Sequence, residues 1–113
     1  MIARRETLLW AVQRATAAVL AFCVLVHLAT IIYAVRTGLS AGAILGRTQG
    51  SFLWAAFYGI FVVAVAIHAA LGLRVIAAEW LRVKGPAAEL ACAGFAALLA
   101  AMGLRAVVAV VGA

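Results

Sequence analysis

The sequence predicts an all-α membrane protein with three transmembrane helices. Of its 113 residues, 70% are hydrophobic and only 11% are charged, whereas a typical soluble domain carries about 25% charged residues. A helix needs about 20 apolar residues to cross the hydrocarbon core of a bilayer, and three segments reach that length: about 12–35, 52–78 and 88–111. Because little sequence remains outside them, we expect one transmembrane domain covering residues 1–113.

The first segment follows the basic start "MIARRETLLW". This start resembles that of a signal peptide, but the apolar run is longer and no small-residue cleavage site follows early. We therefore expect an uncleaved first membrane helix. The connection after it, "RTGLSAGAILGRTQGS", is rich in Gly, Ser and Thr. Its "LSAGAIL" predicts a short interfacial helix with Ser40 near the start, because serine is a favoured N-cap.

The second connection, "EWLRVKGPAAE", contains the only proline, Pro86. We expect Gly85 to end the second helix and Pro86 to lie in the first turn of the third, since glycine is common after helices and proline at their starts. The third segment is rich in alanine and contains Gly94 and Gly103. Small residues allow helices in lipid to approach closely, so this segment is predicted to be a packing helix. Near its end, Arg105 is expected to extend to the membrane interface.

The distribution of basic residues predicts the orientation in the membrane. The net charge is +6, but the basic residues lie at segment ends and form no patch with interleaved aromatic residues, so we expect no nucleic-acid partner. The first connection has only Arg36 and Arg47. More lie at the N-terminus and around the second connection: Arg4, Arg5, Arg14, Arg74, Arg82 and Lys84. The positive-inside rule then places the N-terminus in the cytoplasm and the C-terminus outside.

Several polar residues lie within the apolar segments. The first helix contains Gln13, Arg14, Thr16 and His27, and the second contains His68, Arg74 and Glu79. Ionisable residues inside a membrane are costly and indicate functional sites. Other interpretations exist: the arginines and the glutamate suit interfacial anchors, and a lone histidine can hydrogen-bond a neighbouring helix. Cys23 and Cys92 are interpreted as reduced, small apolar residues.

The spacing of the polar residues predicts their depth. Thr16 and His27 are eleven residues apart, as are His68 and Glu79, so each pair shares one helix face and is separated by about 16 Å. For antiparallel helices, this places Thr16 and Glu79 near the cytoplasmic surface and both histidines near mid-membrane. Gly72, one turn beyond His68, leaves room for a flat macrocycle. Two imidazoles suit the iron of a haem and make a poor zinc site without further ligands.

The stretch "HAALGLRVIAAEW" (68–80) resembles the second helix of the cytochrome b membrane-anchor subunits of succinate dehydrogenase and fumarate reductase. Those three-helix anchors carry an H-x3-G-x-R-x4-D pattern, matched here by His68, Gly72, Arg74 and Glu79, with Glu in place of Asp. Likewise, "QRATA" (13–17) is similar to the H-R-x-S-G motif of the first helix, and the smaller anchor subunits often read R-A-T-A there. Gln13 replaces the motif histidine, and Trp80 replaces a tyrosine of the smaller anchors.

The resemblance implies residue roles. His68 is expected to be an axial ligand of haem b, with Gly72 beside the cofactor and Arg74 near a propionate. Four residues are expected to line a ubiquinone or menaquinone site: Arg14, Thr16, Glu79 and Trp80. His27 has a counterpart in the five-helix, two-haem relatives, so it is expected to ligate a second haem or to pair with His68 across a subunit interface. A hydrogen bond from His27 to a neighbouring helix is the alternative.

These observations together predict a non-catalytic anchor subunit of a succinate:quinone oxidoreductase or quinol:fumarate reductase. It would pass electrons between an iron–sulfur subunit and membrane quinone, with Glu79 as a proton relay. Expected partners are the iron–sulfur and flavoprotein subunits, a second anchor subunit or another copy of this chain, and the lipid bilayer. The expected location is the inner (cytoplasmic) membrane of a bacterium. The alternatives are a haem b electron carrier of another respiratory complex and a small structural membrane protein without a cofactor.

Overall fold

The computed structural model describes residues 2–112. Within this range the chain forms four α-helices: α1 (Ile2–Thr37), α2 (Ala41–Thr48), α3 (Phe52–Trp80) and α4 (Pro86–Val111). The helices α1, α3 and α4 are long and apolar enough to cross a membrane. The predicted class, an all-α protein with three membrane-spanning helices, is therefore confirmed.

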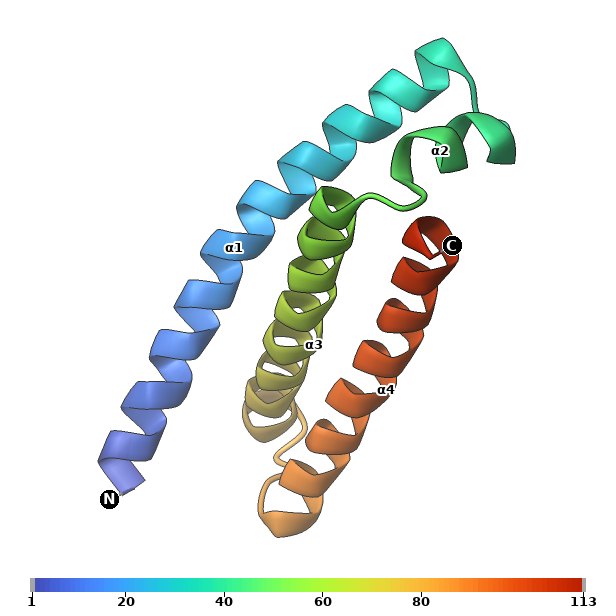
Figure 1. Ribbon diagram of the computed structural model, residues 1–113. Helices are drawn as coiled ribbons and strands as arrows, with labels where there is room; N and C mark the ends of the chain where they lie inside the picture. Colours follow the sequence, from blue (N-terminus) through green and yellow to red (C-terminus); the bar gives the residue numbers. More distant parts are fainter. Residues whose placement is uncertain (1, 113) are drawn as a thin grey trace.

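The long helices run up, down and up, with α3 between the other two (Figure 1). Helix α3 packs against both α1 and α4, and the short helix α2 packs against α4. As a result, the bundle has two distinct ends. The first turns of α1 lie at the same end as the α3–α4 connection. Helix α2 lies at the opposite end, beside the last turns of α4 (Figure 1). We call the latter the α2 end.

Helix α1 begins about ten residues earlier than the apolar segment predicted from the sequence. Hydropathy marks only the part of a helix that suits the membrane, and the preceding turns carry charged side chains. Two of these are paired with other helices: Arg5 with Glu89 in α4 and Glu6 with Arg74 in α3. The ion pairs fix the additional turns of α1 against the bundle.

The predicted short helix is present as α2, and Ser40 is its N-cap. The Ser40 hydroxyl accepts a hydrogen bond from the Ala43 amide at 3.1 Å, which satisfies an otherwise unpaired N–H group of the first turn. Two further hydrogen bonds join the α2 end to α4. The Thr48 hydroxyl donates to the Val110 carbonyl at 2.6 Å, and the Gly50 amide donates to the Val111 carbonyl at 2.9 Å.

The second connection differs in part from the prediction. Helix α3 ends at Trp80, not at Gly85, because the chain reverses at Arg82, which adopts a left-handed φ of 57°. Gly85 instead is the N-cap of α4, with a φ of 108° that suits a residue without a side chain. Pro86 occupies the first turn of α4, as predicted.

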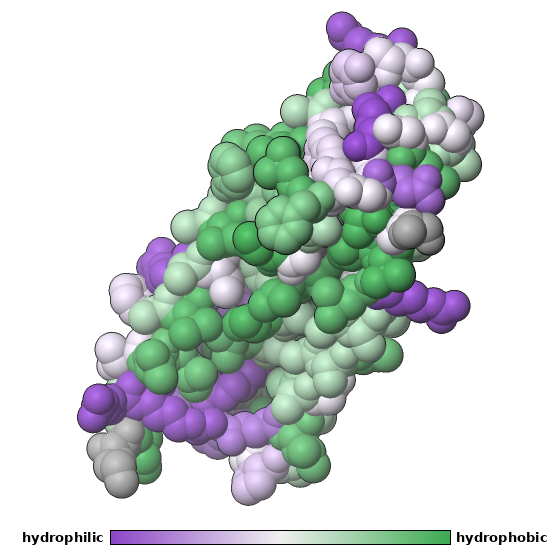
Figure 2. Space-filling model, viewed as in Figure 1, coloured by the Kyte–Doolittle hydropathy of each residue, from purple (hydrophilic) through white to green (hydrophobic). Residues whose placement is uncertain are grey.

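Small residues line the helix contacts. The buried apolar residues are Cys23, Ala64, Ala66, Ala70 and Cys92. At Gly103 the helices α3 and α4 are so close that a Cβ atom would lie 2.5 Å from Val62 Cγ1. Large apolar side chains instead face outward, and the surface in Figure 2 is largely hydrophobic along its middle, with hydrophilic residues mainly toward the two ends. This is the arrangement expected where lipid is the solvent.

Candidate functional site

His68 is hydrogen-bonded to Thr16 between α3 and α1. The His68 Nδ1 atom lies 3.2 Å from the Thr16 Oγ1 atom, and Thr16 is buried, with 9% of its surface exposed. Thr16 Oγ1 also lies 2.9 Å from the Val12 carbonyl oxygen. A carbonyl only accepts, so a Thr16 hydroxyl that donates to Val12 accepts from Nδ1–H in the matching tautomer of a neutral His68. In that tautomer Nε2 has a free lone pair.

Gln13 and Gly72 lie next to this pair. A Cβ atom at Gly72 would lie 3.5 Å from Gln13 Nε2, which is ordinary van der Waals contact. The Gln13 amide is therefore the group next to Gly72. The Gln13 Oε1 atom is buried and has no hydrogen-bond partner among residues 2–112. Such an atom is costly to bury unless a bound molecule satisfies it. In the sequence motif Gln13 only replaces a histidine, and the resemblance implies no role for it.

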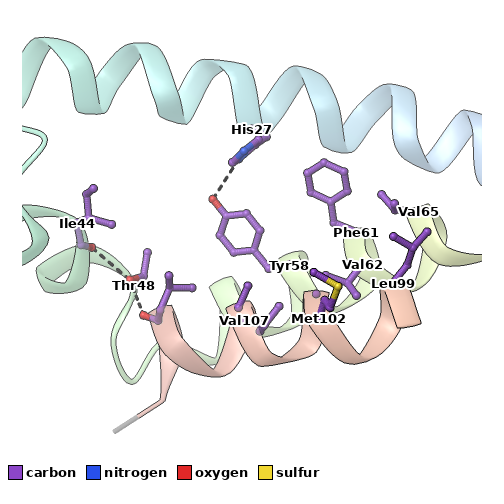
Figure 3. Close-up of a pocket in the computed structure, with 13 residues that line it drawn as sticks. His27, Ile44, Thr48, Tyr58, Phe61, Val62, Val65, Leu99, Met102 and Val107 are labelled. Carbon is purple, nitrogen blue, oxygen red and sulfur yellow. Dashed lines mark hydrogen bonds between the residues drawn. The ribbon is translucent and has the colours of Figure 1, made fainter. Parts of the chain in front are cut away.

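His27 lies in a separate layer, nearer the α2 end. Its Nδ1 atom is 3.4 Å from the Tyr58 hydroxyl, and its ring packs edge-on against the Tyr58 and Phe61 rings. In Figure 3 the Tyr58 hydroxyl points toward the His27 ring across the gap between α3 and α1. These residues line an apolar cavity of about 650 Å³ between the long helices, which Ile44 and Thr48 of α2 also line.

The two histidines therefore do not share one depth. Thr16 lies opposite His68 and His27 lies opposite Tyr58, and Tyr58 precedes His68 by ten residues on α3. Ten residues span about 15 Å, which is too far for two axial ligands of one iron within this chain. The prediction that both histidines lie at mid-membrane, with Thr16 level with Glu79, was wrong.

The reason is the register between α1 and α3. Helix α1 continues for ten residues beyond His27 to Thr37, or about 15 Å, whereas Tyr58 lies only six residues, or about 9 Å, from the start of α3 at Phe52. The end of α1 thus projects past α3, and α2 spans the difference. Residue spacing within each helix says nothing about this offset.

Arg74 is held by two carboxylates. Its Nη2 atom is 2.8 Å from Glu6 Oε1 and 3.5 Å from Glu89 Oε1, and Glu89 in turn is 2.9 Å from Arg5 Nη2. We call Arg5, Glu6, Arg74 and Glu89 the charged cluster. It joins α1, α3 and α4 at the end opposite α2, and its formal charges cancel. The sequence indicated Arg74 as a functional residue but gave no sign of these partners.

The residues predicted to bind quinone are not gathered into one pocket. Arg14 is exposed, with its guanidinium 5.2 Å from the centre of the Trp10 ring. Trp80 is 80% exposed. Glu79 lines a cavity of about 290 Å³ with Arg74, Lys84 and Glu89. It lies eleven residues beyond His68, or about 16 Å along α3, and is therefore distant from Thr16, which contacts His68.

A different cavity opens between α1 and α3. It has a volume of about 300 Å³ and is lined by Glu6, Leu9, Trp10, Gln13, Leu71, Arg74 and Val75. We call it the Gln13 pocket. It lies between the His68–Thr16 pair and the charged cluster and combines an apolar wall with an ion pair and an amide. Its residues are far apart in the sequence, so the pocket was not predictable from a linear motif.

The side chains at His68 suit one axial ligand of a haem. The hydrogen bond from Nδ1 fixes the ring and leaves Nε2 available, which is the usual arrangement of a metal-binding histidine. Among residues 2–112 no group of three or more His, Cys, Asp or Glu side chains could hold a metal ion.

The three long apolar helices are those of a multi-pass membrane protein. Polar and ionisable side chains, including the His68–Thr16 and Arg74–Glu6 pairs, lie between these helices. The chain belongs to the family of the succinate dehydrogenase/fumarate reductase transmembrane subunit, whose model matches residues 1–111. No curated protein and no solved structure gives a significant match. The family suspected from the sequence is confirmed, and with it a membrane subunit of a larger complex in the lipid bilayer.

Proposed function

We propose that this chain is the haem b-binding anchor of a succinate:quinone oxidoreductase or quinol:fumarate reductase in a bacterial inner membrane. It passes electrons between the iron–sulfur subunit and ubiquinone or menaquinone, while the flavoprotein subunit carries out the dicarboxylate chemistry. The family match supports the anchor role. The observation that carries the haem assignment is the 3.2 Å contact between His68 Nδ1 and Thr16 Oγ1.

His68 would hold the haem iron through Nε2, and Thr16 would orient the imidazole. Outer hydrogen bonds of this kind fix the tautomer of a ligating histidine and raise its basicity. The haem supplies one-electron transfer when bound. A second anchor subunit or another copy of this chain would supply any further iron ligand, because the His27 layer is about 15 Å away along the helices.

His27 has a packing role in this proposal. Its Nδ1 atom is engaged by the Tyr58 hydroxyl, and two aromatic rings flank it. This favours the interpretation of an interhelical hydrogen bond over that of a second haem ligand. His27 on α1 and His68 on α3 both lie at the contact between these two helices. Substituting each in turn therefore separates a packing role from an iron-binding role.

Haem content of the intact complex tests the proposal. We expect His68→Ala to lose haem b and His27→Ala to keep it, as measured by reduced-minus-oxidised visible spectra per mole of complex. Retention of haem in His68→Ala would overturn the ligand assignment. Absence of Soret and α bands from the wild-type complex would instead favour a structural anchor without a cofactor.

A further inference from the structure

We propose that the apolar cavity beside His27 holds one acyl chain of an anionic phospholipid, whose phosphate binds Arg36 and Arg47 at the α2 end. The lipid belongs to the leaflet on that side of the membrane. The site is separate from the His68–Thr16 pair and does not depend on the function proposed above. The shape of the cavity, its lining and the charge at its end each support this assignment.

The cavity is long and extends along α4. Its volume of about 650 Å³ lies within the range of ligand-sized pockets. On α4 its lining residues extend from Leu99 to Val110, a distance of about 16 Å. Half of the hydrocarbon core of a bilayer measures about 15 Å, which is the depth reached by the chain of a lipid in one leaflet. Met102 lines the cavity and is 62% exposed, so the cavity opens toward the surrounding lipid.

The lining of the cavity is apolar except for His27, Thr48 and Tyr58 (Figure 3). The Thr48 hydroxyl donates to the Val110 carbonyl, and the Tyr58 hydroxyl lies 3.4 Å from His27 Nδ1. Because these groups already contact one another or the backbone, the interior offers mainly apolar surface. The walls of an unfilled apolar cavity lose dispersion contacts. A flexible hydrocarbon chain restores those contacts and needs no polar partner there.

Two basic side chains lie close together at the α2 end. Arg36 is in the last turn of α1 and Arg47 in the last turn of α2. The Arg47 guanidinium lies 5.1 Å from the centre of the Tyr33 ring. Arg36 follows Tyr33 by three residues, which makes the two residues neighbours on the surface of α1. Both arginines therefore lie beside the same tyrosine.

No acidic side chain balances these two charges. The three acidic residues of the chain lie in or near the charged cluster, at the opposite end: Glu6, Glu79 and Glu89. Neither Arg36 nor Arg47 forms an ion pair among residues 2–112. Basic groups at a membrane surface attract anionic lipids, so a lipid phosphate is the expected counter-charge.

The charged and apolar parts of the site are continuous. Arg47 directly precedes Thr48, and Thr48 and Ile44 line the cavity from α2. In Figure 2 the hydrophilic surface at the α2 end borders directly on the hydrophobic middle of the molecule. One phospholipid can therefore place its phosphate at the arginines and its chain in the cavity.

Lipid titration of the intact, detergent-purified complex tests the proposal. Native mass spectrometry measures lipid binding as phosphatidylglycerol or, separately, phosphatidylcholine with the same acyl chains is added. The head-group variant is Arg36→Gln/Arg47→Gln. Its control is Arg4→Gln/Arg82→Gln, which removes the same charge from exposed arginines at the other end of the molecule. The cavity variant is Ala106→Phe, because Ala106 lines the cavity and a larger ring there occupies the space of the chain.

We expect the wild-type complex to bind phosphatidylglycerol more tightly than phosphatidylcholine. The head-group variant should lose about fivefold in phosphatidylglycerol affinity for each arginine removed and keep its affinity for phosphatidylcholine. Ala106→Phe should weaken the binding of both lipids. The control should match the wild type throughout, and the head-group variant should retain wild-type haem content in its visible spectrum.

Equal affinity of the wild type for the two lipids would overturn the proposal, as would equal losses in the head-group variant and its control. Wild-type lipid binding by Ala106→Phe would show that the chain lies elsewhere. If Ala106→Phe does not assemble, Ala106→Leu is judged by the same criteria, and failure of both to assemble with a second anchor chain would assign the cavity to a partner helix. Absence of haem from the wild-type complex would contradict the proposed function and leave the lipid site unaffected.

Discussion

At the scale of single residues, the Thr16 hydroxyl is the hydrogen-bonding partner of the His68 ring. A hydroxyl that donates to the Val12 carbonyl accepts from Nδ1–H of a neutral His68. In that tautomer Nε2 has the free lone pair. The site depends on a side chain that would not itself touch a metal.

This arrangement predicts the effect of Thr16→Val. The substitution keeps the shape of the side chain but removes the acceptor, so the imidazole loses its orientation. Loss of such an outer hydrogen bond typically weakens metal binding about 10- to 100-fold. We expect a lower affinity for haem and a shifted midpoint potential, measured by haem titration and by a spectroscopic redox titration of the complex.

Thr16→Ser is the matched control for that experiment. Serine retains the hydroxyl and can still donate to Val12 and accept from His68. We expect its haem affinity and potential to remain near those of the wild type. Identical behaviour of Thr16→Val and Thr16→Ser would show that the hydrogen bond does not orient the ligand.

At the scale of helices, α3 and α4 lie in close contact at Gly103. A Cβ atom there would lie 2.5 Å from Val62 Cγ1 and 2.9 Å from Val62 Cγ2. Valine is branched at Cβ and has few alternative rotamers in a helix. The two helices must therefore move apart to accept even a methyl group at this position.

Gly103→Ala is accordingly predicted to destabilise the protein by about 1–3 kcal/mol through overpacking. Gly94→Ala provides the control in the same helix, because nothing lies within 4 Å of a Cβ atom there and alanine favours helix formation by up to about 1 kcal/mol. Thermal unfolding of the detergent-solubilised complex measures both. Equal unfolding temperatures for the two variants would contradict the close contact.

The helices also show what could be predicted from the sequence. Apolar runs, the Ser40 cap and Pro86 are local signals, and each located its element because it acts within a few residues. The offset between α1 and α3 depends instead on the end of α1 and on α2. For that reason the pairing of Thr16 with His68, and of His27 with Tyr58, could not be derived from spacing within either helix.

The partners of Arg74 were hidden for a related reason. Glu6 precedes it by 68 residues and Glu89 follows it by 15. Glu6 also lies in turns of α1 that hydropathy did not assign to a helix. The His68 motif was visible because its members share one helix, whereas the charged cluster and the Gln13 pocket exist only where helices meet.

At the scale of the whole molecule, the bundle buries little. Within residues 2–112 no large side chain has less than 2% of its surface exposed, and α3 lies between α1 and α4 (Figure 1). A haem-sized ligand at His68 would extend beyond this chain. Partner helices are therefore expected to complete both the cofactor site and the burial.

This predicts the behaviour of the chain expressed without the rest of its complex. We expect detergent-purified monomer to contain no stably bound haem b, and haem to appear only in particles that contain two anchor chains. Light scattering combined with absorbance at the Soret band measures both quantities in one run. A monomer with one stably bound haem per chain would show that a second anchor chain is not required to hold the cofactor.

The hydrogen bonds at the α2 end have a consequence for biogenesis. Thr48 donates to Val110, which is synthesised 62 residues later, and Gly50 donates to Val111. Until α4 has entered the membrane, the Gly50 amide lacks its acceptor, and the Thr48 hydroxyl has only the Ile44 carbonyl of its own helix. The cavity beside His27 also lacks the wall formed by Met102 and Val107. The α2 end is therefore complete only after α4 has inserted.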